Sequence, residues 1–198
     1  MRKILLLVGF FTSLAVYGQR QEKHITLAVT NNHSAYPFGS FSSLVSGPYH
    51  PGVELGYGFN WKTANKHDWY QDFHLGYFYH RFVQHAITLY TQAGYRFKPW
   101  KRLQFNTAIG AGYLHSIPAT AVFKLNNNGE YEKAKGLGRA QAMFNFSLGA
   151  RYFLSKKQNA PSLFVQYTQQ LQAPFINAYV PLLPYNNISF GLSIPLKK

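Results

Sequence analysis

The stretch VELGYGFNW, residues 53–61, alternates large apolar residues with glycine, one acid and one amide. Successive side chains of a β-strand point to opposite faces, so this stretch predicts a strand with one apolar and one polar face. The same alternation recurs along the chain after residue 20 and predicts an all-β fold. The eight predicted strands are His24–Thr30, Glu54–Trp61, Trp69–Tyr79, Ile87–Phe97, Leu103–Leu114, Met143–Leu154, Ser162–Leu171 and Ile188–Leu196.

The connections between these strands alternate between two kinds. Three are short, polar and rich in lysine, and most of those between them are long. The short ones are Lys62–Asp68, Lys98–Arg102 and Ser155–Ala160, and the others are residues 31–51, 80–86, 115–139 and 172–187. Tight turns at one rim and longer loops at the other are typical of transmembrane barrels, whose short turns face the periplasm. An even number of strands then places both termini at the short-turn rim.

The composition of the two strand faces distinguishes a membrane barrel from a soluble one. The apolar face carries no charge, and the polar face is mostly glycine, serine, threonine and amides with a few charges of both signs. A soluble barrel or sandwich, the alternative all-β fold, would cover its outer face with lysine and glutamate. A narrow lumen instead needs small residues and charges that have partners. Trp61, Trp69 and Trp100 lie beside the short turns, as expected for an aromatic girdle.

The first 19 residues have the pattern of an export signal. Arg2 and Lys3 precede the apolar run Ile4–Phe11, and Ala15 and Gly18 supply small residues near a cleavage site. The apolar run is shorter than the roughly 20 residues that span a bilayer as a helix. We therefore predict a signal peptide at residues 1–19 and a barrel domain at residues 20–198.

The charge balance is strongly basic, with 20 lysines and arginines against 6 acids among 198 residues. The lysines lie in the connections and not in the alternating segments, so the expected partners are the head groups of membrane lipid and lipopolysaccharide. No recognition helix, zinc spacing or RNA-binding signature is present, and nucleic acid is not an expected partner. The chain has no cysteine and its eight histidines are scattered, so we predict no metal site and no cofactor.

Four repeated motifs carry a resemblance to a known family. They are LGYGF at 55–59, LGYF at 75–78, AGYRF at 93–97 and GAGY at 110–113. With them the chain resembles the small outer-membrane β-barrel proteins of Gram-negative bacteria, of OmpA/OmpX-like architecture, over residues 21–198. The resemblance implies an eight-stranded antiparallel up-and-down barrel in the outer membrane. The chain departs from the family at its end, which reads PLKK rather than closing on an aromatic residue.

The charged residues of the polar face form the first candidate site. Alternation places Glu54, Asp72, His74, Arg96 and Arg151 in the lumen. Unpaired charges are costly in a medium of low dielectric constant, so we expect carboxylate–arginine pairs with amides filling the remaining space. A packed polar plug is the main interpretation, since an eight-stranded lumen is normally filled by its own side chains. A gated path for a small solute is the alternative.

A second candidate site is hydrolytic. Some barrels that the chain resembles are lipid A deacylases, which use a serine, a histidine and an acid near the outer interface. His115 and Ser116 are weak candidates for such a pair, with Glu130 or Glu132 as the acid. The deacylase motif separates histidine and serine by one residue and continues with asparagine, whereas residues 115–118 read HSIP. Adjacent strand residues also point to opposite faces, so no catalytic residue is predicted.

The long connections are the remaining candidates for contact with other molecules. Lys124, Lys133, Lys135 and Arg139 make the third one positive, which suits lipid phosphate. We therefore predict a non-catalytic outer-membrane barrel that is structural or contacts lipopolysaccharide or an external ligand of unknown identity through its outer loops. An acyl hydrolase of the lipid A type at the outer rim and a narrow solute channel are the alternatives.

Overall fold

The computed structural model describes residues 22–34, 39, 42–81, 83–126, 128–133, 137–156, 160–175 and 181–196. The predicted signal peptide lies outside the described residues. Within these ranges, no helix combines the length and the hydropathy that crossing a bilayer would require.

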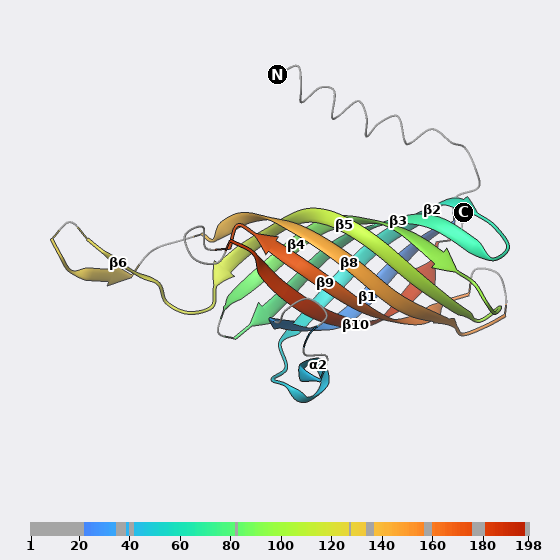
Figure 1. The fold of residues 1–198 in the computed structure, drawn as a ribbon, viewed down its shortest axis with the longest axis horizontal. Coiled ribbons are helices and arrows are strands. Elements are labelled where there is room, and N and C mark those ends of the chain that lie inside the picture. Colours follow the sequence, from blue (N-terminus) through green and yellow to red (C-terminus); the bar gives the residue numbers. More distant parts are fainter. Residues whose placement is uncertain are drawn as a thin grey trace, which may run out of the picture.

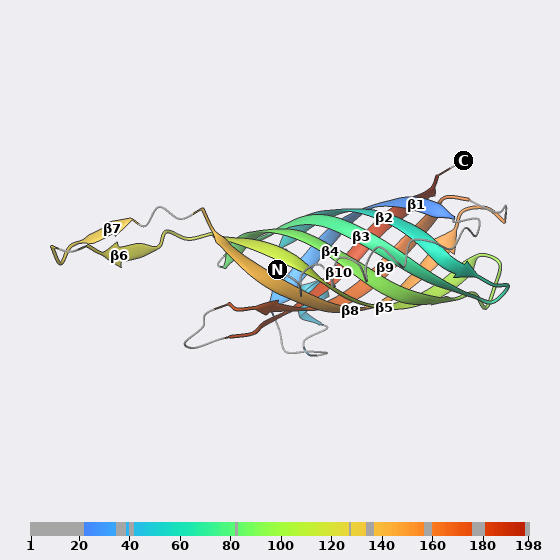
Figure 2. The same ribbon diagram turned by 90° about the horizontal axis from the view of Figure 1, so that it is seen from above.

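The described strands of the main sheet close into a single antiparallel barrel (Figures 1 and 2). Its strands are β1 (Lys23–Ser34), β2 (Pro51–Thr63), β3 (His67–His80), β4 (Gln84–Phe97), β5 (Leu103–Pro118), β8 (Arg139–Phe153), β9 (Ser162–Ala173) and β10 (Leu183–Pro195). Each strand pairs with its neighbour in this order, and β1 pairs with β10 to close the sheet. The predicted eight-stranded up-and-down barrel is therefore confirmed.

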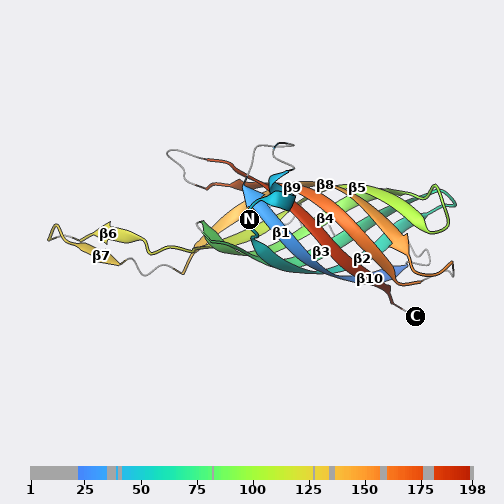
Figure 3. The same ribbon diagram turned by 90° about the horizontal axis from the view of Figure 1, so that it is seen from below.

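Two smaller elements lie in the long connections. The helix α2 (Ser43–Ser46) follows β1, and the Asn31 side chain donates a hydrogen bond to the carbonyl of Leu44 over 2.8 Å. Strands β6 (Phe123–Leu125) and β7 (Tyr131–Lys133) form a hairpin between β5 and β8. This hairpin was not predicted, and it extends well beyond one end of the barrel (Figures 1 and 3). We call that end the long-loop end, and the opposite one the short-turn end.

The strands are longer at the long-loop end than predicted. β1 continues to Ser34, β5 continues to Pro118, and β10 already begins at Leu183. The predicted boundaries of connections 31–51, 115–139 and 172–187 are thus wrong. The physical reason in β1 is that both faces of its extension, NNHS at 31–34, are polar, so the alternation fades while the backbone pairing continues. The extensions of β5 and β10 each contain a proline, Pro118 and Pro184, which is a residue disfavoured in strands.

The two surfaces of the barrel have opposite chemistry. The outward side chains form an apolar belt, in which Leu55 is 50% and Ile109 68% exposed. Most inward side chains are polar and buried, including Glu54, Asp72 and Gln92, and a smaller buried cluster is apolar or aromatic (Phe78, Ala86, Tyr90, Leu114, Met143 and Tyr185). This arrangement is the reverse of a soluble barrel and excludes the alternative all-β fold. Backbone groups that cross hydrocarbon must be paired within the protein, and a closed ladder pairs all of them.

Candidate functional site

The buried carboxylates at mid-height in the lumen lie beside histidine and tyrosine side chains. On β2 and β3, the Nδ1 atom of His74 lies 3.1 Å from the Oε1 atom of Glu54. The hydroxyl of Tyr90 donates to the other oxygen of Glu54 over 2.5 Å, and its ring stacks on His74 with centroids 4.6 Å apart. The hydrogen bond from Tyr90 and the nearby His74 ring stabilise the buried carboxylate against the loss of water.

The second buried carboxylate, Asp72, pairs with His24, which was not among the predicted lumen residues. The Nε2 atom of His24 on β1 lies 3.3 Å from the Oδ1 atom of Asp72. Gly58 of β2 makes this possible, because a Cβ atom there would overlap both the Asp72 carboxylate and the His24 ring. His24 falls in the weakest of the predicted strands, and only the pairing of β1 with β2 brings it over Asp72.

The predicted carboxylate–arginine pairing is wrong for Glu54 and Asp72. Within the described residues, the carboxylate–arginine ion pair of the lumen joins Arg96 and Asp68, with 4.0 Å between Nη1 and Oδ2. The register explains the difference: Arg96 stands opposite Asp68 on the paired strands β3 and β4, whereas Asp72 stands opposite Gln92. The guanidinium of Arg96 also lies over the Tyr70 ring, 4.3 Å from its centroid.

Amides fill the lumen between and above these pairs. Gln92 donates to Asn145 over 2.6 Å and to Ser147 over 2.7 Å. Towards the long-loop end, Gln84 donates to Gln172 over 2.8 Å, and Gln172 donates to Gln141 over 2.6 Å. The glutamine layer was missed because its members lie where the predicted strands had already ended or not yet begun. The lumen is therefore packed with hydrogen-bonded side chains at these heights.

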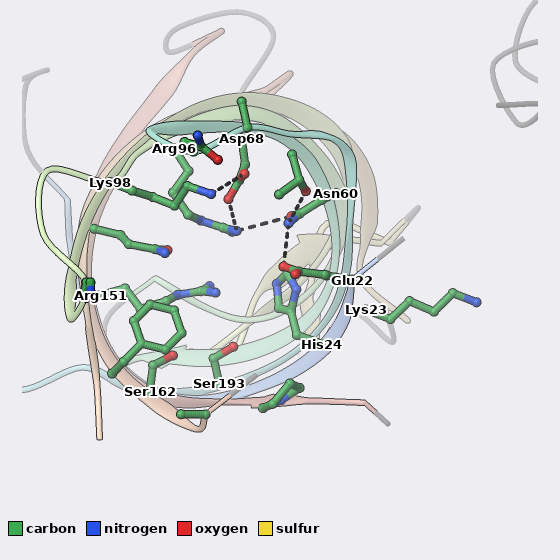
Figure 4. Close-up of a pocket in the computed structure, with 18 of the residues that line it drawn as sticks. Glu22, Lys23, His24, Asn60, Asp68, Arg96, Lys98, Arg151, Ser162 and Ser193 are labelled. Atoms are coloured by element: carbon green, nitrogen blue, oxygen red, sulfur yellow. Dashed lines mark hydrogen bonds and ion pairs between the residues drawn. The ribbon is translucent and has the colours of Figure 1, made fainter. Parts of the chain in front are cut away.

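A cavity of about 520 Å³ opens at the short-turn end (Figure 4). Six of its lining residues are basic, namely Lys23, Arg96, Lys98, Lys101, Arg151 and Lys156, and two are acidic, Glu22 and Asp68. Lys98 pairs with Asp68 over 2.8 Å. Asn60 donates to Glu22 over 3.3 Å and accepts from Arg96 over 3.3 Å. Arg151 reaches into the cavity from β8 (Figure 4).

Three histidines gather at the long-loop end. The rings of His50 and His80 stack with centroids 3.8 Å apart, and His33 lies 6.0 Å from His50. His50 precedes β2 and lies outside the strands, and its burial lowers its pKa. This favours an uncharged ring in the stack. Among the described residues, no group of three or more histidines, cysteines and acids is arranged to hold a metal ion.

The structure separates His115 and Ser116, which both lie on β5 rather than in a loop. His115 is on the outer surface, where its ring bonds to the Tyr113 hydroxyl over 2.8 Å and to the Leu137 carbonyl over 2.7 Å. Ser116 is buried in the lumen and donates to Gln84. A nucleophile and its base need to be within hydrogen-bond reach of each other. The two side chains do not meet this requirement.

The basic residues of the third long connection have different surroundings. Lys133 on β7 is exposed. Arg139 begins β8, and its guanidinium donates to the carbonyl of Phe175 over 2.8 Å. The side chain of Lys124, and the whole of Lys135, lie outside what the structure describes.

Comparison with known proteins supports the fold. No family model and no curated protein matches the sequence. The structure is similar to that of Neisserial surface protein A, with a TM-score of 0.50 and 10% sequence identity over 88% of this chain and 96% of the other. The outer membrane enzyme PagL gives a TM-score of 0.49 at 13% identity, over 87% of this chain and 99% of that protein. The chain thus has the fold of the small eight-stranded outer-membrane β-barrels, and its apolar belt around a polar interior places it in that membrane.

Proposed function

We propose that this protein is a non-catalytic outer-membrane barrel that contacts lipopolysaccharide with its long-loop end. The observation that carries the proposal is the β6–β7 hairpin, which extends beyond the barrel (Figure 1). Its apolar side chains are largely exposed: Phe123 is 59%, Leu125 62% and Tyr131 78% accessible. Exposed apolar groups away from the bilayer belt are typical of a binding surface.

The charge around the hairpin indicates the chemistry of the partner. Residues 122–139 contain four basic residues, Lys124, Lys133, Lys135 and Arg139, and two acids, Glu130 and Glu132. A surface that combines aromatic rings with excess positive charge suits a molecule that carries both acyl chains and phosphate groups. Lipopolysaccharide in the outer leaflet has this chemistry, and an external anionic ligand is the other possible occupant.

The two alternatives receive less support from the geometry. A channel needs a continuous aqueous path, whereas Glu54, His74, Tyr90 and the amides fill the lumen at mid-height. A hydrolase at the outer rim needs a nucleophile beside a base, whereas His115 and Ser116 face opposite sides of the wall.

Binding of lipopolysaccharide to the protein in phosphatidylcholine nanodiscs tests the proposal. The double variant Phe123→Ser, Tyr131→Ser removes two exposed rings without touching the barrel, and we expect it to weaken binding at least about fivefold, since aromatic anchors dominate interface energies. Trp100→Ser is the matched control, because Trp100 is also exposed but lies at the short-turn end. Equal affinities for wild type and the double variant would contradict the proposal.

A further inference from the structure

The cavity at the short-turn end has more positive charge than the chain neutralises. The Lys23 side chain points away from the cavity, while Arg96 and Arg151 point into it (Figure 4). Asp68 is shared by Lys98 at 2.8 Å and Arg96 at 4.0 Å, and Asp72 is held by His24. Glu22, the other acid of the lining, accepts from Asn60 over 3.3 Å, and Arg151 makes no hydrogen bond or ion pair with any residue that the structure describes.

An unpaired guanidinium in this position is unfavourable. Arg151 has five N–H donors, is only partly exposed, and faces the like charge of Arg96 across the same space. Burying a charge without a partner costs free energy, and mid-height in the lumen both carboxylates do have partners. The cavity at the short-turn end thus contains a positive charge without a partner, whereas the charged groups in the middle of the lumen have partners.

We propose that this cavity binds a compact anion of the phosphate class, with Arg151 as its main ligand and Arg96 as the second. The fork of an arginine matches two oxygens of a phosphate. The buried hydroxyl groups of Ser162 and Ser193 line the same cavity and add donors. A volume of about 520 Å³ leaves room for a phosphate group together with a small organic substituent.

Two kinds of molecule would bring a phosphate group to this cavity. One is a soluble phosphate ester of the compartment at the short-turn side, and the other is the head group of a phospholipid. The cavity lies inside the ring of strands and not on the lipid-facing wall (Figure 4), which favours the soluble source. This site shares no residue with the β6–β7 hairpin, so a negative result for one proposal leaves the other unaffected.

Titration with inorganic phosphate tests the site in a maltoside detergent, whose head group carries no phosphate. The readouts are the thermal unfolding midpoint and the ³¹P linewidth, with sodium chloride at matched ionic strength as the reference. We expect phosphate to raise the midpoint where chloride does not. Arg151→Gln should weaken phosphate binding at least about tenfold, and Arg151→Lys, which keeps the charge but not the fork, should weaken it less.

The matched control is Lys62→Gln, which removes an exposed cation of β2 that does not line the cavity. Lys156→Gln removes an exposed lining cation, and should weaken binding about threefold even if the Arg151 variants do not fold.

An effect of phosphate no larger than that of chloride would overturn the proposal, as would equal losses for Arg151→Gln and Lys62→Gln. Weaker phosphate binding in phosphatidylcholine nanodiscs, whose head group carries a phosphate but no net charge, than in the maltoside would identify the lipid head group as the source, and equal binding the soluble ester.

Discussion

At the scale of the residue, the lumen depends on a few groups that hold each other in place. Glu54 accepts from Tyr90 and faces His74, and the Tyr90 ring stacks on His74, so the three side chains form one unit. Alternation predicted that Glu54 and His74 share the polar face, and both side chains are buried. It could not predict their partnership with Tyr90, because alternation assigns a face but not the register between neighbouring strands.

Removing one member of this unit should cost more than removing a lipid-facing neighbour. We expect Glu54→Ala to lower the free energy of unfolding by about 3 kcal/mol, because it leaves His74 and the Tyr90 hydroxyl without a partner in a buried site. Reversible unfolding in urea from lipid vesicles measures this. Tyr90→Phe completes a double-mutant cycle, and strictly additive effects of the two substitutions would show that the unit does not exist.

At the scale of the element, glycines let two neighbouring strands pack against bulky lumen side chains. Gly94 of β4 lies under the Tyr70 ring of β3, where an added Cβ atom would come within 2.7 Å of the ring carbon Cε1. Tyr70 in turn supports the Arg96 guanidinium. Alternation predicted that Gly94 faces the lumen, but the reason for glycine at that position appears only once β3 and β4 are in register.

Substitutions at two adjacent positions of β4 compare its lumen-facing side with its lipid-facing side. Gly94→Val should displace the Tyr70 ring and destabilise the barrel by roughly 2 kcal/mol, since overpacking of a filled interior forces side chains off their rotamers. Ala93→Val changes the adjacent residue, which is exposed on the lipid side, and should be nearly neutral. The urea midpoints of the two variants make the comparison, and a neutral Gly94→Val would mean that the lumen is looser than described.

At the scale of the whole molecule, the sequence was most informative about what each face of the barrel wall contacts, lipid or the lumen. An uncharged face on every strand and a glycine-rich opposite face were enough to predict a closed membrane barrel. The excess charge at the short-turn end was harder to predict, since it arises from β4, β8 and the short turns that follow them, and depends on which acids the closed register assigns to which bases. The β6–β7 hairpin was missed because its three-residue strands are too short to show alternation.

The central claim is that hydrocarbon contacts the apolar face of each strand. The chain has no cysteine, so single substitutions such as Leu55→Cys, Leu75→Cys and Ile109→Cys each create a unique site for a nitroxide label, with Lys133→Cys on the hairpin as the aqueous reference. Relaxation by oxygen, which concentrates in lipid, and by a water-soluble nickel chelate then reports the surroundings of each label in vesicles. We expect strong oxygen and weak nickel effects at the three barrel sites, and the reverse at Lys133→Cys. Strong nickel effects at Leu55→Cys, Leu75→Cys and Ile109→Cys would contradict the central claim.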